Sequence, residues 1–171
     1  MKLEAVSRKP PRGLAELITD LGAGENGFGG TPVHTGELTL EEYLQRCIAM
    51  SDVEELPPGY VPQTVLWVID EAGEAVGIVR MRHYLNEKLR ERGGHIGYYI
   101  RHDQRGKGYA KEALRQAVAA LRIMGEKRAM LTVNMDNVAS IKVIEANGGV
   151  LESEGKDAEG KKFGRFWIEL E

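Results

Sequence analysis

Hydrophobic residues recur at the spacing of an α-helix over residues 107–124, and this is the clearest pattern in the chain. The apolar positions are Ala110, Leu114, Ala117, Val118, Leu121 and Met124. Side chains three and four residues apart share one face of a helix, so the segment predicts an amphipathic helix packed on a core. Gly125 follows the last apolar position, as is typical of a helix end.

Runs of β-branched and aromatic residues predict strands on both sides of that helix. The expected strands cover residues 3–6, 64–69, 75–82, 95–101, 129–133, 150–154 and 163–170, and further helices cover residues 12–21, 39–50 and 138–146. The turn Glu71-Ala72-Gly73-Glu74 predicts a hairpin between two of the strands. Residues 22–36 hold six glycines and are expected to form a loop, whereas residues 86–92 fit a short helix or a loop.

This order of elements predicts an α+β fold in which helices pack on a mixed sheet. The 171 residues suit a single domain, with a helix-rich part over residues 1–60 and a second part over residues 64–170. No stretch approaches the roughly 20 apolar residues of a membrane span, and the N-terminus lacks the apolar run of a secretory signal. With one cysteine, Cys47, and no need of a metal for stability, we expect a cytoplasmic protein that does not act on membranes.

The charge of the chain is uneven. The net charge is −3, which does not indicate nucleic-acid binding. Four basic residues nevertheless fall within eleven positions: Arg101, Arg105, Lys107 and Lys111. An acidic protein with one concentrated basic turn favours a small polyanionic ligand.

The turn before the long helix has the features of a phosphate site. Gly106 and Gly108 lack Cβ atoms, so a ligand can approach the backbone closely. The first amides of the helix have no partner inside it, and the helix dipole adds positive charge there, which suits a pyrophosphate. The alternative is that the two glycines only shape the turn. A dinucleotide-binding fingerprint would need a third glycine where Lys111 stands, and the ending of a Walker loop is missing.

The segment Arg105-Gly106-Lys107-Gly108-Tyr109-Ala110 resembles the acyl-CoA-binding motif of the GCN5-related N-acetyltransferase (GNAT) superfamily. A second block, which covers residues 134–140 with Asn137 and Ser140 and then residues 143–149, resembles the family at the expected distance. The resemblance covers roughly residues 64–170. It implies a GNAT-like fold with a twisted, mostly antiparallel sheet of about six to seven strands, flanked by helices and splayed between two parallel strands.

The resemblance also implies how the cofactor binds. Acetyl-CoA would be the acyl donor, and the amides of the segment from Arg105 to Ala110 would hold its pyrophosphate. The backbone of Tyr99, Ile100 and Arg101 would run beside the pantetheine arm. Asn137 would contact that arm or cap the following helix, or both, and Ser140 lies close by or is only a small residue at the helix start.

Candidate catalytic groups follow from the chemistry of an amine that attacks a thioester directly in a ternary complex. His95 is a candidate general base, because its ordinary pKa near 6.5 suits the task; the alternative is a surface histidine. The resemblance implies that a backbone amide on the strand before the glycine turn stabilises the oxyanion, and Tyr99 or Ile100 would donate it here. Many members of the family place an acidic tyrosine where this chain has Ile144, which leaves Tyr98, Tyr99 and Tyr109 as candidate donors to the thiolate.

Three functions fit these observations. The first is an N-acetyltransferase that acts on a small-molecule amine, and the second is an enzyme that acetylates a protein or peptide. The third is a protein that senses acyl-CoA without turnover, which the absence of the tyrosine keeps open. The sequence leaves the acceptor and the oligomeric state open, with a homodimer as one option.

Overall fold

The computed structural model describes residues 1–170. The strands are β1 (Lys2–Ala5), β2 (Gly24–Glu25), β3 (Phe28–Gly29), β4 (Gln63–Ile69), β5 (Ala75–Arg82), β6 (Ile96–Ile100), β7 (Arg128–Asn134), β8 (Val150–Lys156) and β9 (Lys162–Glu169). The α-helices are α1 (Leu14–Leu21), α2 (Pro32–Thr35), α3 (Leu40–Ala49), α4 (Glu87–Glu91), α5 (Tyr109–Ile123) and α6 (Val138–Ala146), and 3-10 turns cover Val53–Glu55 and His102–Gln104. The α+β fold expected from the order of elements is confirmed.

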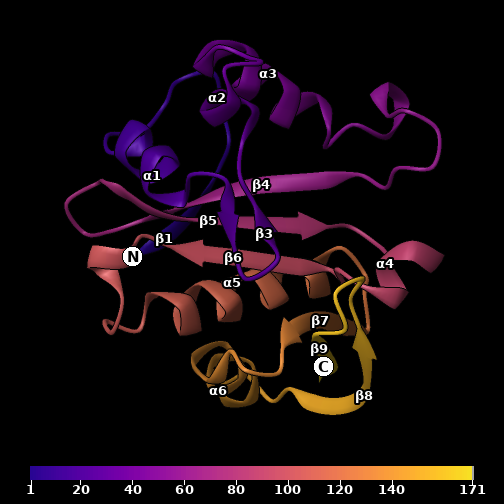
Figure 1. Cartoon of the computed structure of the whole chain (residues 1–171). Coiled ribbons are helices and arrows are strands. Elements are labelled where there is room, and N and C mark those ends of the chain that lie inside the picture. Colours follow the sequence, from indigo (N-terminus) through magenta and orange to yellow (C-terminus); the bar gives the residue numbers. More distant parts are fainter. Residues whose placement is uncertain (171) are drawn as a thin grey trace.

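Seven of these strands form two antiparallel sheets that lie next to each other. The first has the order β1-β4-β5-β6, and the second has the order β7-β9-β8. The strands β6 and β7 point the same way in Figure 1 but form no ladder. They meet at an isolated bridge between Gly94 and Leu131, just before β6 begins. The chain bends there, because Gly93 and Gly94 have φ angles of 116° and 64°.

Helices cover both faces of the first sheet, since its strands are apolar on both sides. One face carries α5, and its core contains Val79, Met81, Leu114 and Leu131. The opposite face carries α1 and α3, and its core contains Trp67, Ile78, Leu17 and Leu44. The two groups of helices lie on opposite sides of the strands in Figure 1. None of the helices within residues 1–170 is both long and apolar enough to cross a membrane.

The N-terminal part differs from the sequence prediction in one place. Residues 22–36 are not a plain loop, because they contain the short hairpin β2–β3 and the single helical turn α2. The hairpin forms because Gly24 and Gly30 allow a close approach of the backbone: a Cβ on either would lie 2.5 Å or less from a carbonyl oxygen. The helix expected over residues 39–50 is α3, and a capping box of Thr39 and Glu42 begins it.

Candidate functional site

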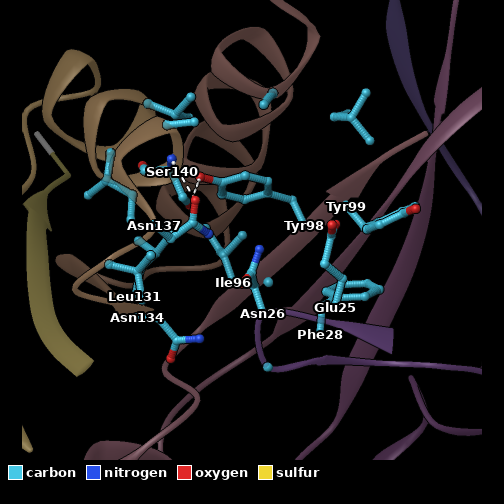
Figure 2. Close-up of a pocket in the computed structure, with 18 of the residues that line it drawn as sticks. Glu25, Asn26, Phe28, Ile96, Tyr98, Tyr99, Leu131, Asn134, Asn137 and Ser140 are labelled. Atoms are coloured by element: carbon cyan, nitrogen blue, oxygen red, sulfur yellow. Dashed lines mark hydrogen bonds between the residues drawn. The ribbon is translucent and has the colours of Figure 1, made fainter. Parts of the chain in front are cut away.

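A cleft of about 660 Å³ opens where β6 and β7 diverge. It is lined by residues 25–28 of the β2–β3 hairpin, 96–100 of β6, 104–106 and 108–111 at the start of α5, 131–134 of β7, and 137, 139, 140 and 142–144 around α6, together with Arg80, Arg82, Arg92, Gly93 and Phe163. Segments that are far apart along the chain therefore meet at the point where the two sheets separate, and Figure 2 shows several of their side chains.

The glycine turn leaves the start of α5 open toward this cleft. Gly106 and Gly108 have φ angles of 79° and 83°, the left-handed region that glycine adopts without strain. A Cβ at either position would meet no other atom within 4 Å. No side chain caps the helix at Gly108. Among residues 1–170, no side chain therefore closes the helix start at these two glycines.

The first amides of α5 are unpaired within the helix. The N–H of Glu112 donates to the carbonyl of Gly108 at 3.2 Å, so the N–H groups of Tyr109, Ala110 and Lys111 precede the first helical hydrogen bonds. Together with the helix dipole, they form a positive site suited to a phosphate group. Gly108, Tyr109, Ala110 and Lys111 all line the cleft.

The basic side chains of the turn are already bonded to other groups of the protein. The guanidinium of Arg105 donates to the Ile100 carbonyl at 2.9 Å and to a Glu25 carboxylate oxygen at 2.5 Å. Lys107 donates to the side chain of Gln104 at 3.0 Å and does not line the cleft. Arg101 likewise does not line the cleft, and its Nε donates to Asp103 Oδ1 at 2.6 Å. The anion site thus depends on backbone amides more than on these charges.

The register of β6 determines which of its amides face the cleft. The backbone N–H of Arg101 donates to the Val76 carbonyl at 2.8 Å, and the backbone N–H of Arg82 donates to the His95 carbonyl at 2.7 Å. Hydrogen-bonded pairs alternate along an antiparallel ladder, so the odd-numbered residues of β6 are bonded to β5. The N–H groups of Tyr98 and Ile100 therefore point toward β7, where residues 1–170 offer them no backbone partner.

Tyr98 and Tyr99 point to opposite faces of the sheet, as Figure 2 shows. The hydroxyl of Tyr98 lies 2.5 Å from Ser140 Oγ at the start of α6. Burial raises the pKa of Tyr98 to about 12, although the hydrogen bond to Ser140 opposes that shift. Asn137 caps α6 by accepting from the Ser140 N–H at 3.3 Å, and both residues line the cleft. Tyr98 therefore stays protonated as a hydroxyl donor beside the opening between the sheets.

Tyr99 belongs to a polar network on the other face. Its hydroxyl donates to Asp20 Oδ2 at 2.6 Å and lies 3.1 Å from His102 Nδ1. Burial acts to raise the pKa of Asp20, but the hydrogen bonds from Tyr99 and His102 prevail and lower it to about 2. The hydrogen bond to Asp20 raises the pKa of His102, whose other nitrogen lies 3.2 Å from Glu25 Oε1. Since Glu25 also holds Arg105, the network ties the N-terminal segment to the glycine turn.

The structure places His95 outside the cleft. It is buried, with 2 % of its surface exposed, and does not line the cavity. The backbone N–H of His95 donates to the Met130 carbonyl at 2.7 Å, and its ring Nδ1 accepts from the backbone N–H of Met130 at 2.9 Å. Burial lowers its pKa despite Glu126, whose carboxylate lies 3.5 Å from Nε2. This geometry favours a structural role in which His95 joins β6 to β7, rather than the role of a base that touches substrate.

Two arginines of the cleft, Arg80 and Arg82, were not singled out from the sequence, whereas Arg92 ends the segment 86–92 that was expected to be a short helix or a loop. Arg80 and Arg82 lie two residues apart on β5, so they share the face that carries α1 and α3. The guanidinium of Arg80 lies 4.0 Å from the ring centre of Phe28. Two arginines on one face of an otherwise apolar strand are the sequence signal that was available.

Comparisons with known proteins agree with this geometry. The family model described as "Acetyltransferase (GNAT) domain" matches residues 27–150. Solved structures with the same fold include an acetyltransferase of the GNAT family from Streptococcus pneumoniae, with 17% identity, a TM-score of 0.69 and 99% of both chains covered. The spermidine N-acetyltransferase SpeG from Vibrio cholerae has 17% identity and a TM-score of 0.67, with 99% of this chain and 95% of that chain covered.

A third similar structure, of yncA from Salmonella typhimurium, was solved with its cofactor acetyl-CoA. It has 13% identity and a TM-score of 0.66, with 99% of this chain and 94% of that chain covered. A search of curated protein sequences found no match. At these identities the structural similarity establishes the fold, while the family model identifies the kind of domain.

Proposed function

The chain belongs to the GNAT acetyltransferase family, and from that premise we propose that it transfers the acetyl group of acetyl-CoA to a small-molecule amine. The cleft between β6 and β7 is the site where donor and acceptor meet. A similar structure contains acetyl-CoA, and another is a spermidine N-acetyltransferase, which supports this donor and an amine acceptor.

The uncapped start of α5 is the observation that carries the proposal. Its amides face an open space beside Gly106 and Gly108, where the diphosphate of coenzyme A fits the charge and the lack of side chains. The pantetheine arm then runs along β6 and pairs with the N–H groups of Tyr98 and Ile100. This arm would occupy the place of the strand that is missing between β6 and β7.

In the transfer step, the amine nitrogen attacks the thioester carbonyl, the new C–N bond forms, and the C–S bond breaks. The oxyanion that develops on the carbonyl needs a donor that is not already paired. The register favours Ile100 over Tyr99, because the N–H of Tyr99 is directed at β5. The hydroxyl of Tyr98 donates to the departing sulfur. Proton transfer from a phenol of pKa about 12 to a thiolate of pKa about 8.5 is uphill by about 4.8 kcal/mol, so Tyr98 stabilises the thiolate by a hydrogen bond.

The acceptor must lose its proton without much help from the cleft. Glu25 is the only carboxylate that lines it among residues 1–170, and Arg105 and His102 already bind it. The hydrogen bond from Arg105 lowers the pKa of Glu25, which weakens it as a base. Neutralising an amine of pKa about 10.4 at pH 7 costs about 4.6 kcal/mol, against about 1 kcal/mol for a pKa near 7.8. Water is therefore the immediate proton acceptor, and amines of low pKa are the favoured substrates.

The experiment measures thiol release from acetyl-CoA in the presence of a panel of amines, with acetyl-CoA binding measured separately by calorimetry. We expect binding, and turnover with at least one amine. Binding without turnover across the panel would favour the sensor, and turnover only with peptides would favour a protein acceptor. No binding of acetyl-CoA would refute the proposal.

A further inference from the structure

One end of the cleft carries an unusual concentration of positive charge. Arg80 and Arg82 extend from β5 on the face that carries α1 and α3, and Arg92 follows α4. A Cβ placed on Gly29 would lie within 4 Å of an Nη atom of Arg80, and one placed on Gly27 would lie within 4 Å of an Nη atom of Arg92. Both arginines therefore lie against the β2–β3 hairpin. The aromatic rings of Phe28 and Phe163 lie at 4.0 Å from Arg80 and 5.0 Å from Arg92. All of these residues except Gly29 line the same cavity.

These three side chains have no directly paired counter-charge within residues 1–170. Backbone hydrogen bonds lower the pKa of Asp157, and the charge of Arg92 contributes to that shift without a direct contact. Within residues 1–170, no carboxylate forms an ion pair with Arg80, Arg82 or Arg92. Arg82 donates only to the carbonyls of Gly93 and Gly94, at 3.2 and 3.4 Å. After burial, the side chains that affect the pKa of Arg80 are those of Tyr43 and Cys47, which are uncharged at pH 7.

Other arginines near the cleft are paired. Arg105 is held by Glu25, and Arg165, which lies over the Phe163 ring, is held by Glu91 at 2.9 Å. Burial lowers the pKa of both Arg80 and Arg82, as it does for a cation removed from water without a partner. Arg80 and Arg82 are half-buried, and Glu25, the one carboxylate that lines the cavity among residues 1–170, is already bound by Arg105 and His102. Their guanidinium groups are therefore suited to an anion brought by a ligand.

Given the proposed acetyl transfer, we propose that the acceptor is an amine that also carries an oxyanion, such as a carboxylate, and that Arg80, Arg82 and Arg92 bind this group. Guanidinium groups match carboxylates through paired hydrogen bonds, which fixes the orientation of the amine as well as its identity. The oxyanion takes no part in bond making. A polyamine would instead place a second ammonium group against three cations, and like charges oppose its binding.

The decisive comparison uses acceptors that differ only in charge. Glutamate and aspartate are compared with glutamine and asparagine, which lack the side-chain carboxylate. In a second set, the α-carboxylate of each of these amino acids is amidated. Spermidine serves as the polyamine. The rate of thiol release gives kcat/KM for each acceptor at saturating acetyl-CoA. We expect at least one acid to exceed its matched amide by tenfold or more, and spermidine to be the poorest acceptor.

Variants locate the effect in the cleft. Arg92 is exposed, so Arg92→Gln leaves the fold intact; we expect it to lower kcat/KM about tenfold for the acid and by much less for the matched amide. Arg82→Lys keeps the charge but loses the fork geometry, and an intermediate loss is expected. Arg90→Gln is the matched control, because Arg90 is an exposed arginine on α4 that does not line the cleft.

The outcomes separate this inference from the proposed function. If acids and amides react equally, or if Arg92→Gln and Arg90→Gln behave alike, the oxyanion site is refuted while acetyl transfer stands. A preference for succinyl-CoA over acetyl-CoA with a neutral amine, lost in Arg92→Gln, would assign the arginines to the acyl donor and overturn the acceptor assignment. Absence of acetyl-CoA binding would refute the proposed function itself.

Discussion

Replacing Gly108 by alanine tests the anion site with a control that the chain itself provides. Gly108 has a φ angle of 83° and a Cβ there would meet nothing within 4 Å. Gly73, in the β4–β5 turn, has the same φ of 83° and the same open surroundings, but it does not line the cleft. Gly108→Ala and Gly73→Ala therefore introduce equal backbone strain and differ in where the new methyl group lies.

The size of each effect follows from the geometry. A residue with a Cβ in the left-handed region costs about 1–2 kcal/mol, so both variants lose about that much free energy of unfolding. At Gly108, the methyl group also enters the space in front of the α5 amides. Losing one hydrogen bond from such an amide to a charged phosphate costs about 1.5–3 kcal/mol. That corresponds to about a tenfold to hundredfold weaker Kd for acetyl-CoA.

Two measurements separate these effects. Urea denaturation without cofactor gives the free energy of unfolding, and titration calorimetry gives the Kd for acetyl-CoA. We expect similar losses of stability in the two variants and a weaker Kd only in Gly108→Ala. If Gly108→Ala binds acetyl-CoA as tightly as Gly73→Ala, the diphosphate does not lie at this turn and the reasoning is wrong.

Three further predictions follow from the site. His95→Ala should lower the free energy of unfolding by about 1–3 kcal/mol, because the buried Met130 N–H loses its acceptor. The pH dependence of kcat/KM, measured by thiol release, should stay unchanged. A shifted pH profile would restore His95 as a base. Tyr98→Phe should lower kcat up to about tenfold, as expected for one lost hydrogen bond, without weakening acetyl-CoA binding in calorimetry, and an unchanged kcat would exclude a role for the hydroxyl. Because the pKa of His102 is raised in the fold, its ion pairs with Asp20 and Glu25 are fully present below the unfolded pKa of about 6.5 and are lost as the pH rises through the folded value. Denaturation from pH 6 to pH 9 should therefore show the stability difference between the wild type and His102→Gln shrinking as the pH rises, and a constant difference would contradict this.

The sequence was most informative where local patterns determine structure. The apolar spacing over residues 107–124 predicted α5, and α3 lies within the helix expected over residues 39–50. The hairpin of β4 and β5 was expected from the turn around Gly73. In each case, neighbouring residues along the chain contain the physical reason for the element.

Contacts between distant segments were harder to predict. The two hydrogen bonds of His95 depend on β7, which lies 35 residues away from it along the chain. The partner of Arg105 is Glu25, which comes from a segment expected to be a loop. The positive charge around Arg80 and Arg82 depends on the lack of carboxylates paired with them within residues 1–170, and the spacing of residues along the sequence gives no information about such neighbours.

The open boundary between β6 and β7 has a consequence for the lifetime of the protein. Unpaired strand edges are templates for association with other chains, and here they are joined at little more than the contact of His95 with Met130. In the proposed mode of binding, the donor covers these edges, and a ligand at a hundred times its Kd adds about 2.7 kcal/mol of stability. When acetyl-CoA is scarce, more molecules would unfold or aggregate, so the abundance of the protein would follow the metabolic supply of its own substrate.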